Sequence, residues 1–131
     1  MDPIVVEADK TRIYEVISNL LTNAIKFTRK SDSNSRDGIN TITIFTDIKS
    51  IQADNKSSGV EEEVRDRGTG IDPNVQGKLF SKFVTTSEAG SGLGLFISKG
   101  IVEAHGGRIW AQNNTDGIGA TFYFSLPLSS K

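Results

Sequence analysis

The sequence contains no cysteine and only one histidine. Without cysteine the chain has no disulfide bond, no thiol nucleophile and no cysteine metal site, and one histidine cannot build a histidine-rich metal cluster. No apolar run approaches the roughly 20 residues that a membrane-spanning helix needs. With a formal net charge of -1, the chain has no basic excess that would point to nucleic acid as a partner. We expect no signal peptide in residues 1–8, which lack a charged start and a long apolar stretch.

The composition is otherwise that of a globular protein, with an excess of glycine. The 131 residues predict a single domain, 1–131, which is long enough to bury a core. The 13 glycines make up about 10% of the chain, against an average of about 7%. Nine of these 13 glycines lie between Gly68 and Gly107, so we expect the functional region there.

Two long segments show helical periodicity. Asp9 is suited to cap a helix over residues 10–28, in which apolar residues recur at intervals of three and four. A second helix is predicted over residues 93–105, and a short one from Pro73 to Phe83. The face of the second helix that we expect to be buried carries Leu93, Ile97, Ile101 and Ala104, and we also expect Phe96 in the core.

Five segments predict β-strands, and polar, turn-forming segments separate most of them. The expected strands are residues 4–6, 39–51, 60–66, 108–112 and 121–126. In the last of these we expect Phe122, Phe124 and Leu126 to face inward. In the second of these, Ile42, Ile44 and Ile48 share one face, which is typical of a half-exposed strand. The sequence therefore predicts an α/β fold in the broad sense, with both helices and strands, and α+β as its class. We expect a two-layer sandwich, with about three helices on one face of a mixed sheet of about five strands.

The first predicted helix carries a polar stripe within its apolar pattern. Glu15, Asn19 and Asn23 recur every four residues and Lys26 follows, so these side chains stack along one face. Asparagine oxygens one turn apart can ligate Mg²⁺, and the lysine adds positive charge for a phosphate. The same stripe is also typical of a solvated helix face, and the spacing alone leaves both interpretations open.

Two glycine-rich segments carry the other candidate chemistry. Residues 66–70 (DRGTG) follow a predicted strand, where the glycines allow close approach to a ligand and Asp66 can accept a hydrogen bond from an amine such as that of adenine. A plain turn with a solvated aspartate is the alternative. Residues 90–94 (GSGLG) open the second long helix, whose free N–H groups favour phosphate, although the segment is not a P-loop. We interpret His105, in the last turn of that helix, as structural.

The order of these segments resembles the GHKL ATPase superfamily and, within it, the catalytic and ATP-binding domain of sensor histidine kinases. The matching segments are 19–28 (NLLTNAIKFT) with the N box, 66–70 with the first glycine box, 80–83 (FSKF) with the F box, 90–95 (GSGLGL) with the second glycine box, 104–107 (AHGG) with the usual helix end and 119–127 (GATFYFSLP) with the final strand. The resemblance covers essentially the whole chain. It implies a Bergerat-type fold that binds ATP and Mg²⁺.

The resemblance also implies roles for single residues. Asn23 would hold Mg²⁺, and Asp66 would bind the adenine amine. Catalytic roles are implied for Asn19 and Lys26, with Glu15 as a candidate helper. The residues implied in ATP binding are Asn19, Asn23, Lys26, Phe27, Asp66, Gly68, Gly70, Ile71, Lys82, Gly90, Ser91, Gly92, Leu93, Gly94, Leu95 and, at the adenine end, Thr121. Residues 74–92 would form the ATP lid.

One position separates the subclasses of the superfamily. DNA gyrase B, MutL and the serine-directed kinases place a glutamate base four residues before the metal-binding asparagine, where this chain has Asn19. A neutral imidazole needs no such base, so the resemblance implies transfer of the γ-phosphate to a histidine rather than hydrolysis. The family's usual lid cation is missing between Phe83 and Gly90, and Lys82 is the nearest candidate. A nucleotide-binding regulatory module without phosphotransfer, or a GHKL ATPase, therefore stays open.

Histidine kinases carry the phosphoacceptor histidine on a separate helical hairpin, and no such hairpin precedes Asp9. We therefore expect the domain to act on a phosphoacceptor and dimerisation domain of a longer parent protein, upstream of a response regulator. The isolated domain is expected to be a cytoplasmic monomer that binds no nucleic acid, whether or not its parent protein is anchored in a membrane.

Overall fold

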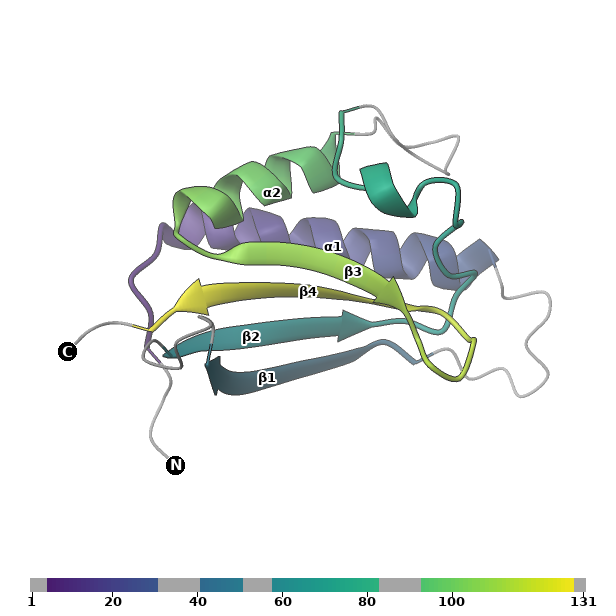
Figure 1. Cartoon of the computed structure of the whole chain (residues 1–131), viewed down its shortest axis with the longest axis horizontal. Helices are drawn as coiled ribbons and strands as arrows, with labels where there is room; N and C mark the ends of the chain where they lie inside the picture. The colour runs from purple at the N-terminus through teal and green to yellow at the C-terminus, as the bar shows by residue number, and fades with distance from the viewer. Residues whose placement is uncertain (1–4, 31–40, 51–57, 83–92, 129–131) are drawn as a thin grey trace.

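The computed structural model describes residues 5–30, 41–50, 58–82 and 93–128. The helices α1 (Lys10–Lys30) and α2 (Gly94–Ala104) lie on one side of a sheet, which gives the described residues two layers (Figure 1). The strands are β1 (Thr43–Ser50), β2 (Ser58–Arg65), β3 (Arg108–Asn113) and β4 (Ala120–Pro127), and a single 3-10 turn, η2, lies at Gln76–Lys78. Neither α-helix in these ranges is both long and apolar enough to cross a lipid bilayer.

The sheet has four strands in the order β1-β2-β4-β3, and every neighbouring pair is antiparallel. The predicted two-layer α+β class is confirmed, but the described sheet is antiparallel rather than mixed. Val5 and Val6 lie outside any strand, and Ile4 lies outside the described residues. The helix predicted from Pro73 is reduced to η2, because Asp72 closes a tight turn with its carbonyl oxygen accepting the N–H of Val75 at 2.9 Å.

Helix α1 begins where its cap was predicted. The Asp9 carboxylate accepts the N–H of Arg12 at 3.2 Å, which satisfies one of the free donors of the first turn. Val16, Leu20 and Ala24 follow at helical spacing and are fully buried beneath the helix. Burying each of the larger two side chains contributes roughly 1.5–3 kcal/mol, so this apolar face fixes α1 on the sheet.

Helix α2 buries a different face from the one predicted. Its buried residues are Ser98 and Val102, whereas Ile97 is 39% exposed and Ala104 is also exposed. Apolar residues occupy most positions of this helix, so their spacing did not single out one face. Phe96, which we also expected in the core, is 39% exposed.

The core lies between the sheet and the two helices. Strand β4 turns Phe122, Phe124 and Leu126 inward as predicted, and strand β2 adds Val60 and Val64 in register with two of them. The buried apolar cluster comprises Val16, Leu20, Ala24, Val60, Val64, Ile71, Leu79, Val102, Ala111, Ala120, Phe122, Phe124 and Leu126.

Strand β1 forms one edge of this sheet and is less covered than its pattern suggested. Ile44 and Ile48 share the inward face of β2, because they pair with Val64 and Val60, yet they remain 52% and 50% exposed. Between them, Thr46 donates a hydrogen bond of 2.8 Å from its hydroxyl to the half-buried carboxylate of Glu62.

His105 ties the end of α2 to the start of α1. Its Nε2 accepts the N–H of Asp9 at 2.9 Å, and its Nδ1 lies 2.8 Å from the carbonyl oxygen of Ile101. Both ring nitrogens therefore have backbone partners, which confirms the structural interpretation of this histidine. Position 107 has room only for glycine, because a Cβ there would overlap the carbonyl oxygen of Ser125 on β4.

Candidate functional site

Asp66 is a buried carboxyl group at the end of β2. It is 1% exposed, and its Oδ1 accepts the N–H groups of Gly68 at 2.9 Å and of Ala120 at 3.1 Å. Its Oδ2 is equally buried but has no hydrogen-bond partner within the described parts of the chain. Burial raises the pKa of Asp66 above its ordinary value, and the two N–H bonds offset part of that effect. The arrangement is an acceptor without a donor, which favours a ligand that supplies one.

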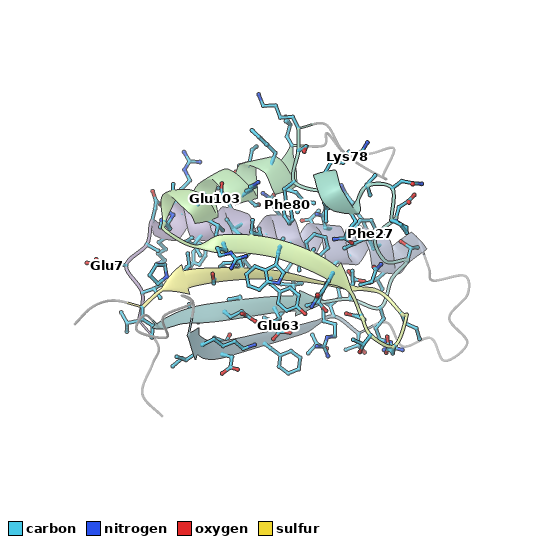
Figure 2. All side chains as sticks on the ribbon, in the orientation of Figure 1. Glu7, Phe27, Glu63, Lys78, Phe80 and Glu103 are labelled. Atoms are coloured by element: carbon cyan, nitrogen blue, oxygen red, sulfur yellow. The ribbon has the colours of Figure 1, made fainter. Side chains whose placement is uncertain are left out.

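Gly68 brings the Asp66 loop into contact with α1. A Cβ at this position would lie 2.5 Å from the carbonyl carbon and 2.8 Å from the Cβ of Phe27. Only glycine permits this approach, so Gly68 allows the Asp66 loop to pack against α1. Phe27 lies on the part of α1 next to the segment that carries η2 (Figure 2).

Asn113 fixes the next part of the loop, and sequence reasoning did not single it out. Its Oδ1 accepts the N–H of Ile71 at 2.7 Å and its Nδ2 donates to the carbonyl oxygen of Ile71 at 3.2 Å. Gly70 beside it has φ of +79°, a conformation that side chains rarely adopt. Ile71 is thereby held in the core, 6% exposed, at the edge of the Asp66 loop.

Asn114 and Thr121 form a second polar contact in this region. The Asn114 Nδ2 donates to the carbonyl oxygen of Asp66 at 2.9 Å, and its Oδ1 accepts the hydroxyl of Thr121. Thr121 pairs with Arg65 across the sheet, and the Arg65 guanidinium donates to the same hydroxyl at 3.4 Å. The structure therefore does not bring the Thr121 hydroxyl to the Asp66 carboxyl group, where the N–H of Ala120 binds instead.

Asn19 connects the polar stripe of α1 to the first turns of α2. Its Nδ2 donates to the carbonyl oxygen of Gly94 at 3.1 Å and to the hydroxyl of Ser98 at 3.0 Å. The predicted N box and second glycine box thus meet through a side chain. Ser98 was not predicted, because a serine within an apolar helix gave no signal of its partner.

The rest of the stripe lies half-buried beside this contact. Asn23 and Lys26 are of intermediate exposure, and neither makes a hydrogen bond or ion pair with another described residue. Glu15 instead pairs with Arg12 at 3.1 Å, away from Asn19. Asn23 and Lys26 are therefore available to a ligand, whereas Glu15 is engaged within α1.

The start of α2 presents uncapped N–H groups. Leu93 stands at its N-cap without a side-chain cap, and no acidic residue lies in its first turn. Together with Gly94 and Leu95, it is half-buried, whereas Gly90, Ser91 and Gly92 lie outside the described residues, as do residues 83–89 of the expected lid. Lys82 points toward α2, with its Nζ 5.2 Å from the centre of the Phe96 ring.

These contacts distinguish the two ends of the polar stripe on α1. Asn19 meets the start of α2 and Phe27 meets the Asp66 loop, and eight residues of α-helix separate them by about 12 Å. Asn19 and the start of α2 therefore offer amide donors at one end of the stripe, whereas the other end has Lys26, beside Phe27, and the buried carboxylate of Asp66. Among the described residues, no three histidine or acidic side chains cluster in a way that could hold a metal ion, so a metal here would depend on asparagine oxygens and the ligand.

Comparisons with known proteins find sensor proteins and catalytic domains of histidine kinases. The chain is 40% identical over 124 residues to the sensor protein FixL of Bradyrhizobium diazoefficiens, covering 95% of this chain and 22% of that protein. It is 34% identical over 132 residues to the sensor protein kinase WalK of Staphylococcus saprophyticus, covering 96% and 19%. The catalytic domain of the histidine kinase ThkA matches with a TM-score of 0.71 at 36% identity, over 94% of this chain and 70% of that one. Full-length ShkA in complex with AMPPNP matches with a TM-score of 0.73 at 27% identity, over 98% and 24%.

The chain thus spans less than a quarter of the length of these two sensor proteins, and it corresponds in fold to the catalytic domains of histidine kinases. Residues 8–130 match the family described as histidine kinase-, DNA gyrase B-, and HSP90-like ATPase. With the match extending over nearly the whole sequence, the chain belongs to this ATPase family.

Proposed function

We propose that the domain binds Mg·ATP and transfers the γ-phosphate to a histidine on a separate phosphoacceptor domain. The observation that carries the proposal is the unpartnered Oδ2 of Asp66, in a residue that is only 1% exposed. A buried carboxylate oxygen without a donor costs free energy, and the exocyclic amine of adenine is a donor that would satisfy it. The chemistry of this end of the site therefore fits a nucleotide.

The other end of the stripe fits the phosphates. The N–H groups at the start of α2 are donors suited to phosphate oxygens, and the ammonium of Lys26, which lies further along α1, would add positive charge for them. The side-chain oxygen of Asn23 would ligate Mg²⁺. The bound ion would neutralise charge on the phosphoryl group that is transferred. Phosphoryl transfer depends mainly on such positioning and charge, so the domain needs no nucleophile of its own.

The choice of histidine as acceptor rests on α1 and on the relatives. The family includes ATPases as well as kinases, but Asn19 occupies the position where a hydrolytic member has its glutamate base, and Glu15 is paired with Arg12. The similar sensor proteins and the ThkA catalytic domain belong to kinases. We infer that the phosphoacceptor and dimerisation domain lies elsewhere in a longer, response-regulator-coupled protein, and that this domain is a cytoplasmic monomer.

Titration calorimetry with AMPPNP in the presence of Mg²⁺ tests the binding step. We expect binding by the unaltered domain and weaker magnesium-dependent binding by Asn23→Asp, because the added negative charge repels the phosphates. Gln112→Glu, an exposed amide-to-carboxylate change on β3, is the matched control and should bind like the unaltered domain. Absence of binding at millimolar AMPPNP would contradict the proposal.

The transfer step needs a second experiment. Mixing the domain with the phosphoacceptor hairpin of its parent protein and γ-labelled ATP should label the acceptor histidine. Binding without labelling would support the alternative of a regulatory nucleotide-binding module, which is favoured by the lack of lysine or arginine between Phe83 and Gly90. Sustained phosphate release by the domain alone would support an ATPase.

A further inference from the structure

Ser98 is a polar side chain at the most buried position of α2. It is 0% exposed, one turn before Val102, on the face that packs against α1. A buried hydroxyl is tolerated when it is hydrogen-bonded, and the partner of this one is the side chain of Asn19. Neither the sequence pattern nor the resemblance gives Ser98 a role.

The contact uses both acceptors that α2 offers on this face. Gly94 and Ser98 are four residues apart, so the carbonyl oxygen of the first and the hydroxyl of the second lie side by side on the helix. The Asn19 Nδ2 donates to these oxygens at 3.1 Å and 3.0 Å. An asparagine amide nitrogen has two hydrogens, so both are satisfied by α2.

This geometry fixes which way the Asn19 carboxamide faces. With Nδ2 held by α2, a flip of the amide would place Oδ1 against the carbonyl oxygen of Gly94, which is repulsive, and the Ser98 hydroxyl gives Nδ2 a second acceptor in the observed orientation. Oδ1 has no hydrogen bond to another described residue, and it belongs to the same stripe as Asn23. The same two bonds also hold the first turn of α2 against α1.

We propose that Ser98 is a positioning residue for the phosphate end of the nucleotide, and this inference rests on the proposed ATP site. It acts through Asn19: the hydroxyl adds the second bond that holds the carboxamide in place and helps to set the distance between α1 and the start of α2. Ser98 touches no phosphate itself. Removal of the hydroxyl leaves Asn19 with one acceptor on α2, so its oxygen and the uncapped amides lose their fixed arrangement.

Ser98→Ala tests the proposal, because alanine favours a helix and leaves only the volume of one hydroxyl empty. We expect its dissociation constant for Mg·AMPPNP to rise about fivefold, the effect of one neutral hydrogen bond. Ser125→Ala is the matched control, since it removes another buried serine hydroxyl that accepts one bond, from the N–H of Arg108 at 3.3 Å on the sheet. Its affinity should equal that of the unaltered domain.

Two further measurements distinguish positioning from a general loss of structure. In an Asn19→Ala background, Ser98→Ala should cause no further loss of affinity, since its effect passes through the missing amide. In nucleotide-free samples, the side-chain N–H resonances of Asn19 should shift in Ser98→Ala and not in Ser125→Ala. Equal affinities of Ser98→Ala and Ser125→Ala, or a further loss in the double variant, would overturn the inference.

The outcome for the unaltered domain separates this inference from the proposed function. If that domain fails to bind Mg·AMPPNP, the proposed function is overturned and the nucleotide role of Ser98 with it. If it binds and Ser98→Ala binds equally well, only the role of Ser98 is overturned.

Discussion

Replacing Asp66 with asparagine separates the binding role of this residue from its structural role. The variant Asp66→Asn keeps an oxygen that can accept the N–H groups of Gly68 and Ala120, at 2.9 Å and 3.1 Å in the parent. It replaces the unpartnered Oδ2 with an amide nitrogen, which donates hydrogen bonds instead of accepting them. The loop should therefore stay folded while the acceptor for a ligand amine disappears.

The expected loss of affinity follows from the burial of the group. A hydrogen bond to a charged group contributes about 1.5–3 kcal/mol, which is roughly a 10- to 150-fold change in dissociation constant. Water does not screen this bond, because Asp66 is 1% exposed. Calorimetry with Mg·AMPPNP should show a change in that range, and the exposed Asp72→Asn, whose carboxylate also accepts a backbone N–H, should show none.

The stability of the nucleotide-free domain should respond in the opposite direction. Burial raises the pKa of Asp66 above its ordinary 3.8, so its contribution to stability is lost as pH rises from 3.8 through the raised pKa. Asp66→Asn has no such loss and should be at least as stable as the parent at pH 7 in urea unfolding. An unchanged affinity, or a variant that unfolds far more readily than the parent at pH 7, would refute the reasoning.

Three further changes probe the scaffold around the site. Burial raises the pKa of Glu62, so the stabilising contribution of this residue is lost as pH rises from 4.5 through the raised pKa. Over that pH range, the free energy of unfolding of Glu62→Gln in urea should increase relative to that of the parent. A difference between the two that does not change with pH would contradict this. His105→Ala should lower the free energy of unfolding by about 1–2 kcal/mol through two lost hydrogen bonds, and its affinity for AMPPNP should not change. Gly68→Ala should cost about 1–3 kcal/mol through overpacking against Phe27 and should weaken AMPPNP binding, whereas Gly77→Ala, with nothing within 4 Å, should leave both measurements unchanged.

Local patterns predicted the elements whose signals lie within a few residues. Asp9 caps α1, and the apolar spacing of that helix matches the residues buried beneath it. The inward-facing residues of β4 could also be predicted, because successive side chains of a strand alternate between the two faces of the sheet. These parts are determined by chemistry along the chain and need no knowledge of distant partners.

Long-range contacts determined the parts that the sequence did not reveal. The face of α2 that contacts α1 depends on Ser98 and its bond to Asn19, which lies far away in sequence. Asn113 became part of the site only through its bonds to Ile71, and in the sequence it resembled other turn residues. The close approach of Gly68 to the backbone of Phe27 was not predicted either, because these residues lie far apart in the sequence.

The central pairing of the sheet joins β2 to β4, and the β4 residue Ala120 supplies an N–H to Asp66. During synthesis β2, which ends next to Asp66, cannot complete this pairing until β4 has been made. Because a long loop must close between these two strands, we expect them to pair more slowly than β3 and β4, which are close in sequence. The carboxyl group is buried only when that step is complete. If the domain binds ATP, the nucleotide would therefore stabilise only chains that have finished folding.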